Sequence, residues 1–165
     1  MLQPQSQPDP LFLREADLRE AIELLFYAYR DFTGEPDAIL ARYDFGRAHH
    51  RVIYFVGRNP GITVGALLSI LKITKQSLSR VLGQLIDEGF IEQRKDHADR
   101  RRRPLFLTAN GSELEHLLTE CQCRRIAGAY RAAGGAAVAG FRAVLGGIIN
   151  VEDRPQFATV GRPWD

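Results

Sequence analysis

Apolar residues recur at helical spacing along most of the chain, which predicts a mainly helical protein. In residues 11–32, Leu18, Ile22, Leu25 and Tyr29 lie three or four residues apart, the spacing of one helix face. A second apolar set widens this stripe, so the helix is expected to bury more than one face. This set comprises Ala21, Leu24, Ala28 and Phe32.

The first helix is expected to end at the Thr-Gly-Glu-Pro run of residues 33–36, because proline suits the first turn of a following helix. A second helical pattern covers residues 37–57. Gly57 and the Asn-Pro-Gly turn at residues 59–61 are expected to stop it.

Two shorter helical patterns follow, separated by about three residues. Thr63 and Thr74 are N-cap candidates, and the break between the helices falls at Lys72 and Ile73. The second helix is expected over residues 75–88, with Gly89 as its left-handed terminator. Two helices joined in this way predict a helix-turn-helix.

Residues 90–94 and 104–108 are short extended segments around a polar loop, residues 95–103. Strands on both sides of a basic loop, directly after a helix-turn-helix, predict a winged helix. Thr108 is expected to cap a long helix that fades at Gly134 and Gly135, and a last helix is predicted over residues 136–149.

The predicted fold class is therefore mainly α with a small β-wing: a winged helix-turn-helix flanked by N- and C-terminal helices. The segments that follow from this assignment are a flexible arm (1–10), N-terminal helices (11–58), the winged helix-turn-helix (59–108), C-terminal helices (109–149) and a tail (150–165). A chain of 165 residues with 45% hydrophobic and 25% charged residues is typical of a globular protein with a real core.

Charge is localised rather than abundant. The formal net charge is only +2, yet residues 94–103 hold six lysines and arginines against two aspartates, a local balance of +4. Concentrated positive charge attracts a phosphate backbone. We therefore expect double-stranded DNA as the partner, with a wing contact set of Lys95, His97, Arg100, Arg101, Arg102 and Arg103.

The start of the second motif helix is rich in hydrogen-bond donors and has no carboxylate before Asp87. Glutamine can form two hydrogen bonds with adenine, and arginine or lysine can form hydrogen bonds with guanine. The predicted recognition set is Thr74, Lys75, Gln76, Ser77, Ser79 and Arg80. In the wing, an arginine suits a narrow minor groove, and Asp99 is positioned to orient Arg101 through a charge-assisted bond.

The sequence resembles the MarR family of bacterial transcriptional regulators over residues 60–115. The recognition-helix run at 73–96 and the wing at 99–111 carry the likeness. Within them, the Asp-x-Arg of the family's wing falls on Asp99 and Arg101. The Leu-Thr-x-x-Gly that opens the family's next helix falls on Leu107, Thr108 and Gly111.

The resemblance implies a homodimer in which the terminal helices interlock. Its two winged helices are expected to read a pseudo-palindromic operator whose half-sites are about one helical turn apart. The resemblance also implies a small-molecule effector between the dimerisation helices and the DNA-binding lobe. The candidate lining residues here are Tyr29, Tyr43, His49, His50, Arg51 and Tyr54.

Other functions are less well supported by the residues. No Gly-rich phosphate loop, carboxylate pair or nucleophile motif indicates an enzyme, and no cofactor or metal is expected. Cys121 and Cys123 point about 200° apart on a helix and are not expected to pair, which agrees with a reducing cytoplasm. No secretory signal or membrane span is expected. A protein-interaction adaptor and a nonspecific architectural DNA binder remain as alternatives.

Overall fold

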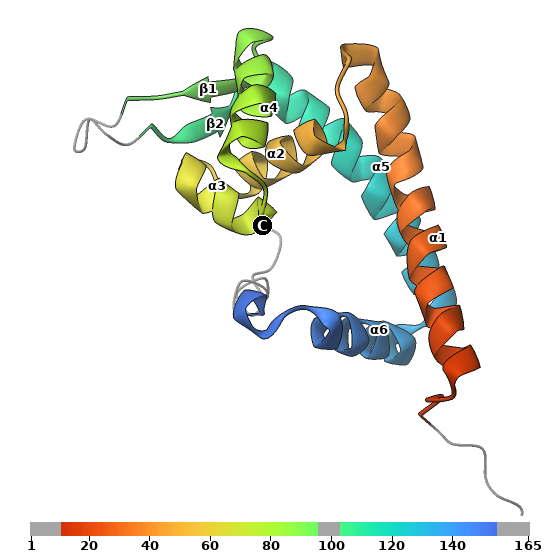
Figure 1. The fold of residues 1–165 in the computed structure, drawn as a ribbon. Helices are drawn as coiled ribbons and strands as arrows, with labels where there is room; N and C mark the ends of the chain where they lie inside the picture. Colours follow the sequence, from red (N-terminus) through yellow and green to blue (C-terminus); the bar gives the residue numbers. More distant parts are fainter. Residues whose placement is uncertain (1–10, 96–102, 155–165) are drawn as a thin grey trace, which may run out of the picture. The chain divides into compact units, whose positions relative to one another are not determined.

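The computed structural model describes residues 11–95 and 103–154, and these form helices and one small sheet (Figure 1). The order is α1 (Glu15–Leu40), a 3-10 turn (Ala41–Tyr43), α2 (Arg47–Arg58), α3 (Val64–Leu71), α4 (Lys75–Asp87), β1 (Ile91–Gln93), β2 (Leu105–Leu107), α5 (Ala109–Ala133), α6 (Gly135–Ile148) and a last 3-10 turn (Val151–Asp153). The chain divides within α5 into two units, residues 1–122 and 123–165.

The expected end of the first helix at residues 33–36 is wrong, since α1 runs on to Leu40. Pro36 lies inside the helix and cannot donate a backbone hydrogen bond. Burial offsets this loss, since Thr33, Pro36 and Leu40 are all buried. One turn earlier, Thr33 Oγ1 donates to the carbonyl oxygens of Tyr29 and Arg30. Tertiary packing thus overrides the local preference of proline.

The break between the first two helices lies at residues 41–46 instead, so the predicted second helix over 37–57 begins ten residues late. Asp44 adopts a left-handed conformation with φ 57°, which aspartate tolerates better than most residues. Gly46 then forms the N-cap of α2. The Asp44 backbone therefore turns the chain from α1 into α2.

The helix-turn-helix is confirmed, including its capping residues. Thr63 Oγ1 accepts the backbone N–H of Ala66, and Thr74 Oγ1 accepts that of Ser77. Lys72 is left-handed at the break between α3 and α4, and Gly89 follows α4 with φ 80°. These local features fix where α4 begins and ends.

The wing is confirmed as an antiparallel pair of strands, with Glu92 opposite Phe106 in the register. A short third segment, not predicted, extends the pair: Ile62 forms an antiparallel bridge with Leu105. In Figure 1 the two strands lie beside α4 and lead away from it together. The wing is thus anchored on both sides of the helix-turn-helix.

One hydrophobic core holds the first unit together. It draws buried side chains from every helix of this unit and from both strands. The fully enclosed ones are Leu40, Val52, Ile53, Val56, Leu67, Leu78, Val81, Leu85, Ile91, Leu105, Leu114 and Leu118. In α4, only the face with Leu78, Val81, Leu82 and Leu85 is buried, so its opposite face stays available.

The second unit contains the end of α5 and helix α6. Tyr130 and Phe141 meet edge to face, with ring centroids 6.1 Å apart. Arg154 donates to the carbonyl oxygens of Gly147 and Ile149 and so caps the last turn of α6. None of the α6 residues is buried, which leaves Phe141, Val144 and Ile148 exposed.

Gly111 provides a test of the packing in the first unit. A Cβ at this position would overlap the backbone carbonyl of Phe90. Because backbone cannot move aside like a flexible side chain, Gly111→Ala is expected to lower the free energy of unfolding by about 3 kcal/mol or more, as measured by urea denaturation.

Gly83→Ala is the matched control, because nothing lies within 4 Å of a Cβ there. Inside a helix this change is expected to be neutral or to stabilise by up to about 1 kcal/mol. Equal stabilities of the two variants would contradict the close approach at Gly111.

Candidate nucleic-acid interface

The first turns of α4 present a polar surface. Leu78 is buried in the core, while the predicted recognition set around it is exposed: Thr74, Lys75, Gln76, Ser77, Ser79 and Arg80. Leu78 shares its buried face with Val81, Leu82 and Leu85, which follow it at helical spacing. Gln76, Ser77, Ser79 and Arg80 lie off that face. The exposed start of α4 carries two cations, and the acidic Asp87 and Glu88 lie at its other end.

Thr74 and Ser77 form a local pair at the start of this surface. Thr74 Oγ1 accepts the backbone N–H of Ser77 at 3.1 Å and donates its own hydrogen to Ser77 Oγ at 2.9 Å. Thr74 thereby caps α4, and its donor is used within the protein. The hydroxyl hydrogen of Ser77 is not used in this pair. Thr74 therefore shapes the surface, and Ser77 can extend it.

The structure describes only the two ends of the predicted wing set. Lys95 and Arg103 are exposed where the strands enter and leave the loop. His97, Asp99, Arg100, Arg101 and Arg102 lie outside the described residues, so their predicted contacts stay predictions.

Arg94 is a cation at the base of the wing that the sequence prediction did not select. Its guanidinium lies 4.2 Å from the centroid of the Phe106 ring and donates to Glu92 Oε1 at 2.6 and 2.8 Å. Glu92 lies on β1 opposite Phe106 of β2, and Arg94 directly follows the strand. Because extended backbone alternates its side chains, residues 92 and 94 lie on the same face. This alternation is the signal in the sequence that could have identified it.

The predicted effector residues fall into separate places in the structure. Tyr43 and His49 belong to an aromatic cluster with Phe45 and Phe90, in which Phe45 contacts each of the other three rings. Tyr54 packs edge to face on Phe55. Tyr29 and Arg51 meet directly, through a 3.1 Å hydrogen bond from Arg51 Nη2 to Tyr29 Oη.

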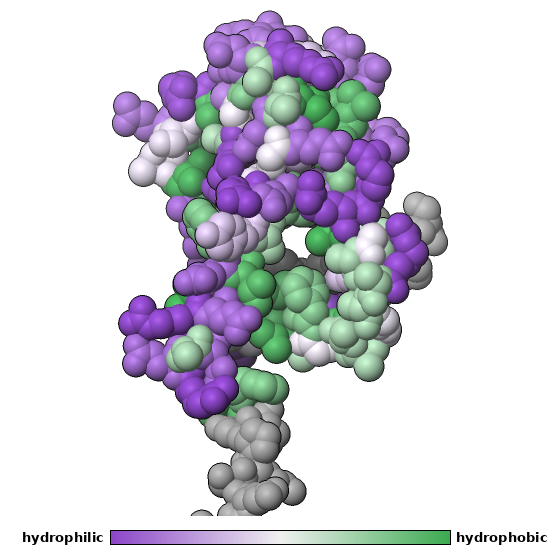
Figure 2. Space-filling view, turned by 90° about the vertical axis from the view of Figure 1, so that its right-hand side faces the viewer, coloured by the Kyte–Doolittle hydropathy of each residue, from purple (hydrophilic) through white to green (hydrophobic). Residues whose placement is uncertain are grey.

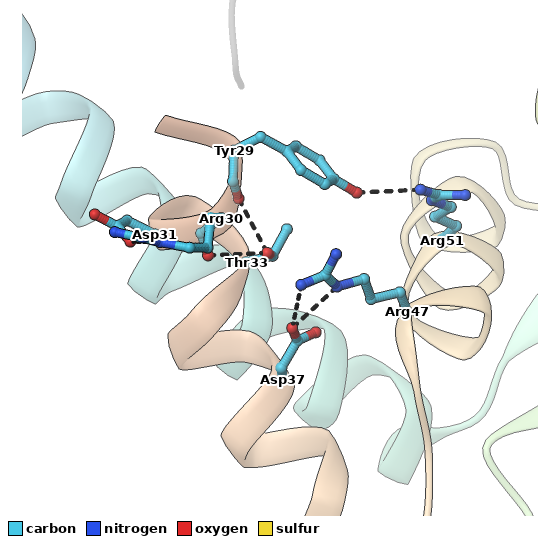
Figure 3. A network of polar contacts seen from close by, with 7 residues as sticks. All are labelled: Tyr29, Arg30, Asp31, Thr33, Asp37, Arg47 and Arg51. Carbon is cyan, nitrogen blue, oxygen red and sulfur yellow. Dashed lines mark hydrogen bonds and ion pairs between the residues drawn. The ribbon is translucent and has the colours of Figure 1, made fainter. Parts of the chain in front are cut away.

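The Tyr29–Arg51 pair is part of a polar network between α1 and α2 (Figure 3). Arg47 donates to Asp37 Oδ2 at 2.9 and 3.0 Å and also lies over the Tyr29 ring, 5.5 Å from its centroid. Hydrogen bonding to Asp37 raises the pKa of the Arg47 guanidinium above its ordinary value. Asp37 Oδ1 is buried without a hydrogen-bond partner among the described residues.

His50 lies near this network, and burial lowers its pKa below the ordinary value. Asp37 and Glu115 partly oppose the effect of burial because negative charge favours the imidazolium, whereas Arg51 adds to it. The neutral form of His50 is therefore the one that the folded protein favours.

Comparison with known proteins identifies the family. The model of the MarR family matches residues 43–102. Over 135 residues the chain is 56% identical to the HTH-type transcriptional regulator PetP of Rhodobacter capsulatus, covering 82% of this chain and 81% of PetP. The chain is a MarR-family transcriptional regulator.

Solved structures of MarR-family proteins show the same fold. The crystal structure of MarR aligns with a TM-score of 0.57 and 25% identity, over 78% of this chain and 91% of MarR. Streptococcus pneumoniae FabT, solved in complex with DNA, aligns with a TM-score of 0.71 and 19% identity, over 88% of this chain and 99% of FabT. The winged helix of this MarR-family chain is thereby confirmed, α4 being its second motif helix.

Two further observations concern the expectations that the two cysteines do not pair and that no helix spans a membrane. Cys121 and Cys123 are not joined by a disulfide: Cys121 is buried and donates to the Leu118 carbonyl oxygen, and Cys123 is exposed. Across the ranges that the structure describes, we find no helix whose length and apolar character would let it span a membrane.

The environment of His50 predicts how stability changes with pH. Because its pKa is lowered on folding, the unfolded chain binds the proton more readily, and stability must fall as the pH drops below the ordinary value near 6.5. His50→Gln removes this titration. Between about pH 7.5 and 5.5, its free energy of unfolding is expected to decline less than that of the parent protein.

The measurement is urea denaturation at a series of pH values. His116, exposed on α5, is the matched control, and His116→Gln is expected to follow the parent profile. A parallel decline in His50→Gln and parent would show that the burial of His50 does not contribute to acid sensitivity.

Proposed function

We propose that this regulator binds a pseudo-palindromic DNA operator sequence-specifically, as a homodimer that reads bases with α4. The observation that carries the proposal is the exposed, donor-rich start of α4, held at its first turn by the Thr74 cap. A helix about 10–12 Å across fits the major groove. Its first turns then face base edges, where Gln76 and Arg80 can form bidentate bonds.

The wing serves as an anchor in this proposal. Lys95 and Arg103 stand exposed at its base, and Arg94 is held beside them by Phe106 and Glu92. The arginines between Lys95 and Arg103, residues 100–102, add a dense positive charge that suits phosphate or a narrow minor groove. Anchoring by the wing fixes the position of the protein, while α4 supplies most of the specificity.

Two exposed apolar surfaces support a homodimer. The first half of α1 buries no residue and exposes Leu18, Ile22 and Leu25 at helical spacing, and α6 exposes Phe141, Val144 and Ile148. Figure 2 shows green, apolar side chains reaching the surface in the lower half of the view. Burial of such surface against a second copy explains why these helices are apolar.

A small-molecule effector site is proposed at Tyr29 and Arg51, with His50 nearby. These side chains bridge α1 and α2, and the Arg51 guanidinium is exposed. An anionic aromatic ligand can pair with Arg51 and displace Tyr29 from it. Because α1 would then lose one of its bonds to the DNA-binding lobe, ligand binding would alter the position of that lobe.

The experiment that tests the function is selection of genomic DNA fragments by the full-length protein, followed by footprinting. A short inverted repeat bound by two copies of the chain is the expected result. Uniform weak binding to all fragments would favour an architectural binder, and no binding would favour a protein-interaction adaptor. The protein is expected to act in the cytoplasm, with no cofactor and no enzymatic turnover.

Arg80→Ala tests the role of α4. If Arg80 contacts a base or a phosphate, the variant is expected to lose about 1–3 kcal/mol of binding free energy for the selected operator, measured by fluorescence anisotropy. Arg131→Ala, an exposed substitution on α5, is the control and should bind as the parent does. Parent-like affinity of Arg80→Ala would remove this side chain from the interface.

The wing is tested by replacing Arg101 and Arg102 together with alanine. Each phosphate contact releases about one counterion, so the slope of log affinity against log salt is expected to fall by about one to two. The slope comes from operator titrations at several potassium chloride concentrations. A slope equal to that of the parent would show that these arginines do not contact DNA.

A further inference from the structure

A chain of hydrogen bonds joins α2 to α4 through a buried histidine. His49 is 6% exposed, and its ring stacks on Phe45 with centroids 4.7 Å apart. His49 Nδ1 lies 3.0 Å from the backbone nitrogen of Gly46, and Nε2 lies 2.9 Å from Gln84 Oε1. Gln84 Nε2 in turn lies 2.9 Å from Glu88 Oε1.

The two ends of this chain determine the direction of every bond in it. The Gly46 N–H can only donate, so His49 Nδ1 must accept. The neutral imidazole then carries its hydrogen on Nε2 and donates to Gln84 Oε1. A carboxylate can only accept, so the Gln84 amide must donate to Glu88. His49 therefore acts as a neutral, oriented donor to α4.

Gln84 lies on the same side of α4 as two residues of the predicted recognition set. Arg80 precedes it by four positions and Ser77 by seven, which is the spacing of one helix row. The distance along the axis from Gln84 to Ser77 is only about 10 Å at 1.5 Å per residue. A constraint at Gln84 thus passes along a rigid helix to both side chains.

We propose that His49 is a positioning residue for DNA reading: through Gln84 it fixes the rotation of α4 about its axis. The apolar face of α4 holds the helix in the core but is not directional, whereas a hydrogen bond is sensitive to both distance and angle. The bond from His49 selects one rotation among those that the core allows. This inference rests on the proposed function of α4.

Paired substitutions separate this role from a structural one. Gln84→Met keeps the size of the side chain but removes its amide, and with it both the acceptor for His49 and the donor to Glu88. The variants at position 49 test the bond to His49 while Gln84 is kept. Asparagine at position 49 keeps an acceptor for the Gly46 N–H in the place of Nδ1, but its side chain is too short to reach Gln84. Glutamine at position 49 reaches Gln84 but lacks the acceptor for the Gly46 N–H. His49→Asn therefore breaks the link, and His49→Gln restores it.

The probes are a duplex carrying the operator from the genomic selection and a scrambled duplex of the same composition. Gln84→Met and His49→Asn are each expected to bind the operator about three- to tenfold more weakly, the range for one hydrogen bond. The double variant should be no weaker than the weaker single variant, because both remove the same bond. His49→Gln should bind as the parent does.

Affinity for the scrambled duplex is expected to stay unchanged in all variants, because attraction to phosphate does not depend on the rotation of α4. A merely structural role would lower stability, measured by urea denaturation, without this difference between operator and scrambled DNA. Should His49→Asn fail to fold, Gln84→Met and His49→Gln still decide the question. His116→Asn on α5 is the control for loss of an imidazole.

Parent-like operator binding by Gln84→Met, or an equal loss on both duplexes, would overturn the inference. Arg80→Ala keeps this failure apart from failure of the proposed function. If Arg80→Ala binds the operator weakly while Gln84→Met binds it as the parent does, only the positioning role is wrong. If neither variant is weakened, α4 does not read DNA and both proposals fail.

Discussion

The junction between Gly89 and Gly111 is the constraint on which the DNA-binding lobe depends. Thr108 Oγ1 donates to the Gly89 carbonyl oxygen at 2.7 Å and accepts the Gly111 N–H at 3.1 Å, and the Thr108 N–H bonds to the Phe90 carbonyl oxygen. One threonine thus ties the end of α4, the start of β1 and the first turn of α5 together. Gly111 allows this approach, because any side chain would overlap Phe90.

The direction of the wing follows from this junction. β1 leaves Gly89 at a fixed place, and β2 returns to Thr108, so both strands are anchored at the same point. At the far end of the described strands, the Arg94 N–H bonds to the Pro104 carbonyl oxygen, and the Arg94 side chain rests on Phe106. This geometry supports the proposed role of the wing as a local anchor, although the net charge of the chain is only +2.

Features encoded by neighbouring residues could be predicted from the sequence. The caps Thr63 and Thr74, the break at Lys72 and the terminator Gly89 each depend on a side chain or backbone preference that acts within a few residues. The path of α1 through Pro36 could not be predicted in this way. It depends on the burial of Pro36 and Leu40, and burial is decided by segments far away in the sequence.

The same distinction between local and long-range features separates the predicted recognition set on α4 from the contacts that hold α4 in place. Exposure of Gln76 and Arg80 follows from the period of one helix, so the pattern alone places them on α4. The bond between His49 and Gln84 joins residues 35 positions apart, and the hydrogen bond between Arg51 and Tyr29 spans 22. No local pattern indicates either pair. In this protein the groups proposed to touch DNA are visible in the sequence, whereas the groups proposed to set their orientation become visible only in the fold.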